Sequence, residues 1–415
     1  MTIRVELLRE SEDVLARAVE VSHSRGSLRT PSYAVNVIDI DRRLLREKDL
    51  LGIAEIYTAF RLEQLKSLSR DISLQQEFEY RMNSYVRRVP SDQLVTAIPL
   101  LEGEQGYSFS DDEEISKYAT FITELMTNPR VDLICTPAFH RIAEDRIPIF
   151  IEKFLEATTS YSKDTALTIP YASRETRDKV VETYLKWADK NNRALLNFLC
   201  IDYNGSNPIS KYSYHNYVLG YVWLLERETG EPVVMYGVNV KYSRVAKKYD
   251  ELPARDLVSY FTQVDIYGRS HKRRPIPGEV AERLRADEAV KKQKLLNRER
   301  YTYVSLDKMY KDQSLRPPEV EAEIIEQLLA EASYNIRRVE RKIKLINIMI
   351  TIMEAKVLGE FFRSGEYDSF KTPLQYLKSK EIVRIDNILL QRLEKLAKLH
   401  RHELRTKSLD EYLSK

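Results

Sequence analysis

The sequence predicts an α/β protein in which a TIM-type (β/α)8 barrel is followed by an α-helical C-terminal region. From about residue 30 to residue 268, short apolar segments alternate with amphipathic ones, which is typical of alternating strands and helices. About seven such units in roughly 240 residues fit a closed barrel of about 250 residues better than an open sheet. The strand segments are apolar almost throughout, like parallel strands buried on both faces, and read SYAVNVIDI, LVTAIPLL, VDLICTPAF, ALTIPY, LLNFLCIDY, PVVMYGVNV and LVSYFTQVDIY.

The segments between these predicted strands carry helix signals. Ser173 suits the N-cap position of an amphipathic segment, and acidic residues begin another segment at Asp111. The stretch at 41–88 is longer and more helical than a simple crossover between strands. We therefore expect a helical insertion at 41–88, packed beside the barrel.

Two proline pairs divide the rest of the chain. Pro275 and Pro277 follow the last predicted strand, and Pro317 and Pro318 precede a helical region. The sequence thus predicts an α/β barrel domain at 1–275, a basic linker or helix at 276–318 and a helical domain at 319–415.

The helical region contains apolar residues in an unbroken 4,3 spacing, which predicts a coiled-coil seam or a helical hairpin with the amphipathic segment at 381–404. The seam could pack within its own chain, or it could form a homodimer through residues 325–357. Its positions are Ile325, Leu329, Ala332, Ile336, Val339, Ile343, Ile346, Ile350, Met353 and Val357.

Charge and composition narrow the functional classes. The 66 Lys and Arg residues nearly balance the 63 Asp and Glu residues. However, the segment from Arg269 to Arg300 has eleven basic residues against five acidic ones. It could contact the phosphates of tRNA or DNA, or it could be a solvated linker.

The sequence also predicts a cellular compartment. The N-terminal residues are charged throughout, unlike a signal peptide, and the most apolar stretch, LINIMITIM, is too short to span a membrane. The two cysteines, Cys135 and Cys200, lie in apolar runs, as in proteins of reducing compartments. We expect a cytoplasmic protein without membrane contact; its 12 glycines and high charge are typical of thermophilic proteins.

Several kinds of chemistry have no sequence support. The chain contains neither GxxxxGK[ST] nor GxGxxG, which excludes P-loop and dinucleotide-binding motifs. It also lacks HExxH, CxxC and GxSxG, so no cofactor or metal site is predicted, although carboxylates could still hold Mg²⁺.

Candidate site residues follow from the barrel itself, because active sites of such barrels lie at the carboxyl ends of the strands. Asp202 and Asp265 stand out, since each lies within an apolar run where an unpaired carboxylate is costly. The other polar residues near predicted strand ends are Asn36, Asp39, Glu102, Glu104, Asp132, His140, Tyr171, Asn204, Asn239, Lys241 and Tyr267.

The order of these strand ends resembles the tRNA-guanine transglycosylase superfamily over roughly residues 24–274. The similar fragments are Gly26-Ser-Leu-Arg-Thr-Pro31, Glu102-Gly-Glu-Gln-Gly-Tyr107, Val131-Asp132-Leu-Ile, Met235-Tyr-Gly237-Val and Val-Asp265-Ile-Tyr-Gly268.

The resemblance implies a TIM barrel that exchanges a guanine base in nucleic acid through a carboxylate nucleophile. Strand-end placement and the resemblance together predict a catalytic role for the carboxylates at Glu102, Glu104, Asp132, Asp202 and Asp265. They also predict a substrate pocket at Asn36, Tyr107, Asn204, Gly237, Asn239, Lys241 and Tyr267. The resemblance further implies nucleic-acid contacts at Arg269, His271, Lys272, Arg273 and Arg274. The chain departs from the family at the nucleophile position, which is Gly268, and it lacks the family's cysteine zinc motif.

Three functions remain open from the sequence. The chain could bind or exchange a base in tRNA or DNA, as a base-exchanging glycosyltransferase. It could be a non-catalytic scaffold with a degenerate barrel that recruits a partner through its heptad helix. It could also be an unrelated carboxylate-dependent barrel enzyme that acts on a small molecule.

Overall fold

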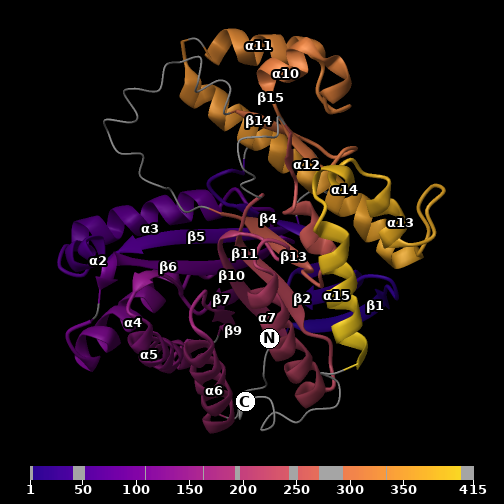
Figure 1. Ribbon diagram of the computed structural model, residues 1–415. Helices are drawn as coiled ribbons and strands as arrows, with labels where there is room; N and C mark the ends of the chain where they lie inside the picture. Colours follow the sequence, from indigo (N-terminus) through magenta and orange to yellow (C-terminus); the bar gives the residue numbers. More distant parts are fainter. Residues whose placement is uncertain are drawn as a thin grey trace.

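The computed structural model describes residues 3–40, 52–107, 109–161, 163–191, 197–242, 251–270, 293–332 and 334–402. It contains an eight-stranded parallel β-barrel surrounded by helices, together with a set of C-terminal helices (Figure 1). The predicted fold class is confirmed.

The barrel strands follow one another around the barrel in chain order. The last strand pairs with the first in parallel, which closes the barrel. The eight strands are β4 Ser32–Asn36, β5 Ile53–Arg61, β6 Leu94–Tyr107, β7 Leu133–Cys135, β9 Asp164–Ile169, β10 Phe198–Ser206, β11 Val234–Val240 and β13 Ile266–Arg269. A further strand, β8 Ala138–Ile142, pairs with the outer half of β6.

The helical insertion predicted at 41–88 is wrong in part, because it contains the barrel strand β5. Only the later residues are helical, in α2 Leu62–Leu68 and α3 Ile72–Val86. Residues 41–51 lie outside the described part of the chain. The sequence did not predict this strand, because its apolar run is interrupted by Glu55, which is buried inside the barrel.

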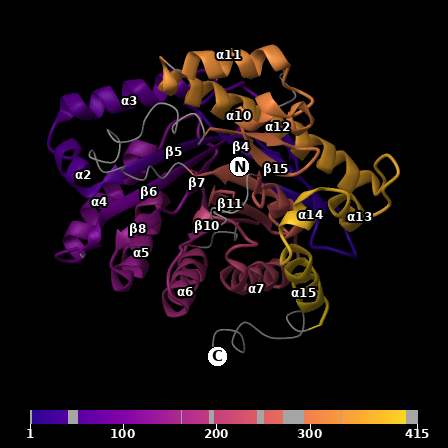
Figure 2. The ribbon, with the colours of Figure 1, turned by 45° about the horizontal axis from the view of Figure 1, so that its top comes forward.

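The outer helices form an arc around the strands (Figure 2). They are α4 Asp112–Met126, α5 Ile147–Thr159, α6 Arg174–Lys190 and α7 Tyr212–Thr229. Both predicted N-caps are confirmed: the side chains of Asp111 and Ser173 accept hydrogen bonds from backbone amides of α4 and α6. Helix α7 ends at Gly230, whose φ of 69° is the left-handed conformation that glycine adopts without strain.

A small antiparallel sheet covers the amino-terminal end of the barrel. It consists of β1 Arg4–Glu10, β2 Arg17–His23 and β3 Gly26–Arg29. Ile3, Val5 and Val19 from this region join the barrel interior in one apolar cluster, which therefore closes that end of the barrel.

The segment predicted as a basic linker or helix at 276–318 holds a short helix, Leu306–Lys311, and also two strands that were not predicted; residues 271–292 lie outside the described part. These strands, β14 Lys294–Asn297 and β15 Thr302–Ser305, form an antiparallel sheet with β12 Glu251–Pro253. The helices that follow are α10 Leu306–Lys311, α11 Ala322–Ala332, α12 Ile336–Ser364, α13 Pro373–Lys378, α14 Ile382–Ile385 and α15 Leu389–His402. Short 3₁₀ turns occur at Glu144–Arg146, Leu257–Phe261 and Gln313–Leu315.

The predicted heptad seam is divided between two helices, α11 and α12, so it is not one continuous coiled-coil helix. Half of the seam positions are buried in the protein's own core, and the other half are half-buried. The buried positions are Ile325, Ala332, Val339, Ile343 and Ile350. The seam therefore packs within the chain, while a homodimer through residues 325–357 stays a prediction. No described helix is long and apolar enough to cross a bilayer.

Candidate active site at the barrel mouth

The strongest part of the predicted site is the middle of β10. Asp202 is fully buried there, and its Oδ1 accepts hydrogen bonds of 2.8 Å from the backbone N–H of Asn204 and from Nδ2 of Asn239. Asn204 and Asn239 have φ values of 51° and 57°, the left-handed region that non-glycine residues seldom occupy. Such backbone conformations cluster at functional sites, so Asp202 is held by a local geometry that stability alone does not favour.

A second buried carboxylate, Glu55 on β5, was not predicted from the sequence. It accepts a hydrogen bond from the hydroxyl of Tyr236 on β11. Burial raises the pKa of Tyr236 well above its usual range, and the charge and hydrogen bond of Glu55 raise it further. Tyr236 is therefore a neutral donor to Glu55 at any physiological pH.

Gly268 explains how Glu55 fits inside the barrel. A Cβ at position 268 would lie only 2.4 Å from Oε2 of Glu55 and 3.2 Å from the hydroxyl of Tyr236. The position where the resembling family has its nucleophile is thus a glycine, and the neighbouring space is filled by a carboxylate from another strand. The sequence signal for Glu55 was the one that singled out Asp202: an acid inside an apolar run, here IAEIYTAF.

Tyr57, two residues beyond Glu55 on the same strand, connects the two carboxylates to the barrel mouth. Its pKa is well above the usual value because its hydroxyl is buried and faces the charge of Asp202, and more weakly those of Glu55 and Glu102. A hydrogen bond with the side chain of Asn239 acts in the opposite direction. The neutral hydroxyl therefore lies among these charges as a hydrogen-bonding group.

Tyr57 also lines a cavity of about 560 Å³ at the carboxyl end of the barrel. Its walls come from the barrel and from the C-terminal region, so the two parts of the chain share this site. The barrel provides Asn36, Ile38, Asp39, Tyr57, Ala59, Tyr242, Arg269 and Ser270, and the C-terminal region provides Gln293, Lys294, Tyr303, Glu340, Ile343, Lys344 and Asn347.

The rim of this cavity combines aromatic rings with cations. The rings of Tyr242 and Tyr303 lie 4.5 Å apart at an interplanar angle of 35°. Arg269 lies close to both: burial acts to lower its pKa, but nearby Tyr33, Tyr303, Tyr242 and Asp256 raise it above its ordinary value, so the guanidinium stays charged. An aromatic surface beside a cation suits a planar, anionic or polar ligand.

The C-terminal wall adds two lysines. Burial lowers the pKa of Lys294, partly offset by Asp307. Lys344 forms an ion pair of 2.5 Å with Asp39 of the barrel. Asn347 accepts a hydrogen bond from the Leu296 amide and donates one to the Lys294 carbonyl, which fixes helix α12 against β14 at the cavity.

Asp265 and Asp132, both predicted as catalytic, lie at the opposite end of the barrel. Each directly precedes its strand rather than ending it. Asp265 forms a buried bidentate ion pair with Arg17, at 2.9 Å and 2.7 Å, and accepts a hydrogen bond from the Met235 amide. The expectation for Asp265 is wrong because Leu257–Phe261, read as strand in the sequence, is a 3₁₀ turn, so the strand starts later.

Asp132, like Asp265, forms an ion pair with an arginine at the amino end of the barrel. Its carboxylate binds the guanidinium of Arg25 from the β2–β3 turn and accepts a hydrogen bond from the Val95 amide. Asp132 therefore links the β1–β2–β3 sheet to the amino end of the barrel. Its predicted catalytic role is also wrong, since the barrel separates it from the mouth.

Other predicted residues lie near the mouth but outside its floor. Glu102 is half-buried on the extension of β6, 3.6 Å from Arg61, and Glu104 is exposed. Tyr107 ends that extension and its hydroxyl donates weakly to Glu114 of α4, so it is directed away from the cavity. Lys241 is half-buried at the end of β11, beside Tyr242.

Two residues that were predicted to line the pocket, Gly237 and Tyr267, lie on the outer face of the barrel. Gly237 faces outward, because a Cβ there would meet Tyr203, Val240 and Val264. Tyr267 packs against Tyr33 and Tyr260, with ring centroids 5.2 Å and 4.9 Å away, and is buried between strand and helices. Both pocket assignments are wrong, since residues alternate between the two faces of a strand.

Of the predicted nucleic-acid contacts, only Arg269 lies in the described part of the chain, at the cavity rim. His271, Lys272, Arg273 and Arg274 lie outside it. Among the described residues, no group of three or more His, Cys, Asp or Glu side chains could hold a metal ion. No protein-family model matches this chain, and no curated protein is significantly similar to it.

Proposed function

We propose that the barrel mouth binds a base of tRNA or DNA and exchanges it, with Asp202 as the reactive carboxylate. The observation that carries this proposal is the cavity itself: Tyr57 lines it and faces the buried carboxylates Asp202 and Glu55, and Arg269 with the Tyr242–Tyr303 pair lies at its rim. The floor offers hydrogen-bonding groups for the edge of a base, and the rim offers stacking and a cation for a phosphate.

In this proposal the reaction is a double displacement at the sugar. An oxygen of Asp202 forms a bond to C1′ while the bond from C1′ to the base nitrogen breaks, and the departing base takes up a proton. An incoming base then attacks C1′, loses a proton and releases the carboxylate. Asp202 suits this role better than Glu55, because its charge acts more strongly than that of Glu55 on Tyr57, the residue that lines the cavity.

Access to Asp202 requires a movement of Tyr57. Asp202 has no exposed surface, and Tyr57 is the residue that both lines the cavity and faces the carboxylate. A base that enters the cavity would therefore displace the phenol ring and take over its hydrogen bonds. The exchange is expected to depend on the Tyr57 side chain as well as on Asp202.

The first experiment measures binding of the purified chain to tRNA and to duplex DNA as a function of salt. Phosphate contacts predict a steep loss of affinity with salt. Reversal of the basic run, with Lys272→Glu, Arg273→Glu and Arg274→Glu, is expected to flatten that dependence. Binding that this triple variant leaves unchanged would count against a nucleic-acid function for the run.

The second experiment follows the incorporation of labelled guanine into tRNA or DNA. Asp202→Asn keeps the shape of the side chain and should abolish incorporation, while the fold remains intact by circular dichroism. Glu104→Gln is the matched control, since this carboxylate is exposed outside the cavity, and it should leave the rate unchanged. Equal rates for wild type and Asp202→Asn would refute the assignment of Asp202.

A further inference from the structure

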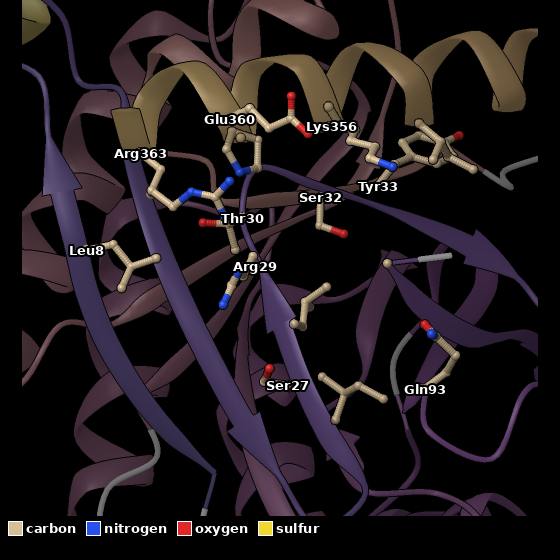
Figure 3. A pocket seen from close by; sticks show the side chains of 18 of the residues that line it. Leu8, Ser27, Arg29, Thr30, Ser32, Tyr33, Gln93, Lys356, Glu360 and Arg363 are labelled. Carbon is tan, nitrogen blue, oxygen red and sulfur yellow. The ribbon is translucent and has the colours of Figure 1, made fainter. Parts of the chain in front are cut away.

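A second cavity, of about 500 Å³, lies at the opposite end of the barrel from the mouth (Figure 3). One side is formed by β3 and by the residues that begin β4 and β6. The other side is the second half of helix α12, from Ile352 to Arg363. No residue that lines this cavity lines the mouth, so it is a separate site.

Cationic side chains reach this cavity from two elements. Arg29 comes from β3, while Lys356 and Arg363 lie seven residues apart on α12, which puts them on one face of the helix. Figure 3 shows Lys356 and Arg363 along the helix and Arg29 on the strand below it. The acids among the described lining residues are Asp92 and Glu360, so three cations face two acids.

The cavity lining also contains an imidazole and several hydroxyl groups. Nδ1 of His23, which also lines the cavity, is buried and has no hydrogen-bond partner among the described residues. Buried polar atoms in folded proteins are nearly always paired, and an exception calls for a water molecule or a ligand. Ser27, Thr30 and Ser32 add hydroxyl groups to the same lining.

The surroundings leave these cations available. Within the described part of the chain, the ion pair of Arg29 is an exposed one with Glu20, at 3.4 Å, and exposed pairs of this kind contribute little. Gly359 lies between the two cations on α12, and a Cβ there would be in ordinary van der Waals contact with Thr30 and Pro31, at 3.6 Å and 3.8 Å, so the helix packs closely against the start of β4 at this point. All three cations line the same cavity, and a ligand there would not displace a buried ion pair that involves Arg29.

From these observations we infer a binding site for a phosphate group, held by Arg29, Lys356 and Arg363. Arginine forks match the oxygens of a phosphate, and charge-assisted hydrogen bonds to them are the strong ones. The phosphate could belong to a small phosphate ester or to a nucleic-acid backbone. The inference does not depend on base exchange at the mouth.

Titration calorimetry of the full chain with inorganic pyrophosphate tests this site. The double variant Lys356→Gln, Arg363→Gln should weaken binding by at least about tenfold, the equivalent of one lost charge-assisted hydrogen bond. Glu360→Gln removes an opposing charge and should tighten binding. The matched control is Lys179→Gln, Lys186→Gln on α6, which changes the net charge equally at two exposed positions and should bind like wild type.

The outcomes separate clearly, because all substituted residues are exposed and the variants should fold. Absence of pyrophosphate binding to wild type, or equal affinity of wild type and the Lys356–Arg363 variant, overturns the site. If binding is confirmed, competition by a single-stranded oligonucleotide assigns the phosphate to a nucleic-acid backbone. Lack of competition assigns it to a small phosphate ester.

Discussion

The contact between Gly268 and Glu55 supports a quantitative prediction for Gly268→Ala. The new methyl group would lie 2.4 Å from Oε2 of Glu55, about 1 Å inside ordinary van der Waals contact, in a site without open space. Overpacking of a core by one methyl group costs about 1–3 kcal/mol, and the displaced Tyr236–Glu55 hydrogen bond adds about 1 kcal/mol. We expect Gly268→Ala to lower the free energy of unfolding by about 2–4 kcal/mol.

Urea denaturation, followed by circular dichroism and tyrosine fluorescence, measures this loss as a shift of the midpoint at constant slope. Gly359→Ala is the matched control, because its methyl group meets nothing closer than 3.6 Å and lies within helix α12, where alanine is favoured by up to about 1 kcal/mol. The double variant Glu55→Ala, Gly268→Ala should recover part of the loss, since the clashing atom is gone. A midpoint of Gly268→Ala equal to that of wild type would refute the placement of Glu55.

Three further predictions concern buried polar groups. Arg17→Ala leaves Asp265 buried without its bidentate partner and should destabilise the protein by about 3–5 kcal/mol in chemical denaturation, unlike Arg29→Ala, whose pair is exposed. Burial lowers the pKa of His215 from 6.5 to about 3, so the contribution of the neutral imidazole to stability is complete above pH 6.5 and is lost as the pH falls towards 3. The free energy of unfolding should therefore drop by about 2 kcal/mol between pH 7 and pH 5. His215→Gln should abolish this part of the drop. Glu354→Gln weakens a buried cluster in which Tyr301, Tyr376 and Arg298 donate to this carboxylate, and should lower the melting temperature, whereas Glu340→Gln on the exposed face of α12 should not.

The barrel could be predicted from the sequence because its strands are apolar on both faces and its helices carry their own caps. The runs around Cys135 and Cys200 show this well, since both cysteines are fully buried inside the barrel with their Sγ atoms 3.1 Å apart. Strand β5 could not be found in this way. Its inward residues include Glu55 and Tyr57, and their polarity made the segment read as an amphipathic helix.

The site was predicted only in part, for a geometric reason. An acid at the edge of an apolar run can lie at either end of a strand, and the sequence does not say which. Asp202 lies within its strand and faces Tyr57 of the cavity lining, whereas Asp265 and Asp132 precede their strands and hold the opposite end closed. The C-terminal wall of the cavity could not be foreseen either, because β14 and α12 approach the barrel through contacts between residues far apart in the chain.

Helix α12 has a consequence for how this protein can be divided. With 29 residues it is about 43 Å long. It runs from the cavity at the mouth, along β4 and β2, to the second cavity at the opposite end of the barrel. Its inner face, with Leu358, Phe361 and Phe362, completes the same apolar core as the barrel strands. A fragment that stops near residue 275 would therefore keep all eight strands and still expose a full side of its core, so the smallest stable unit of this chain includes the helix that looks, in the sequence, like an appendage.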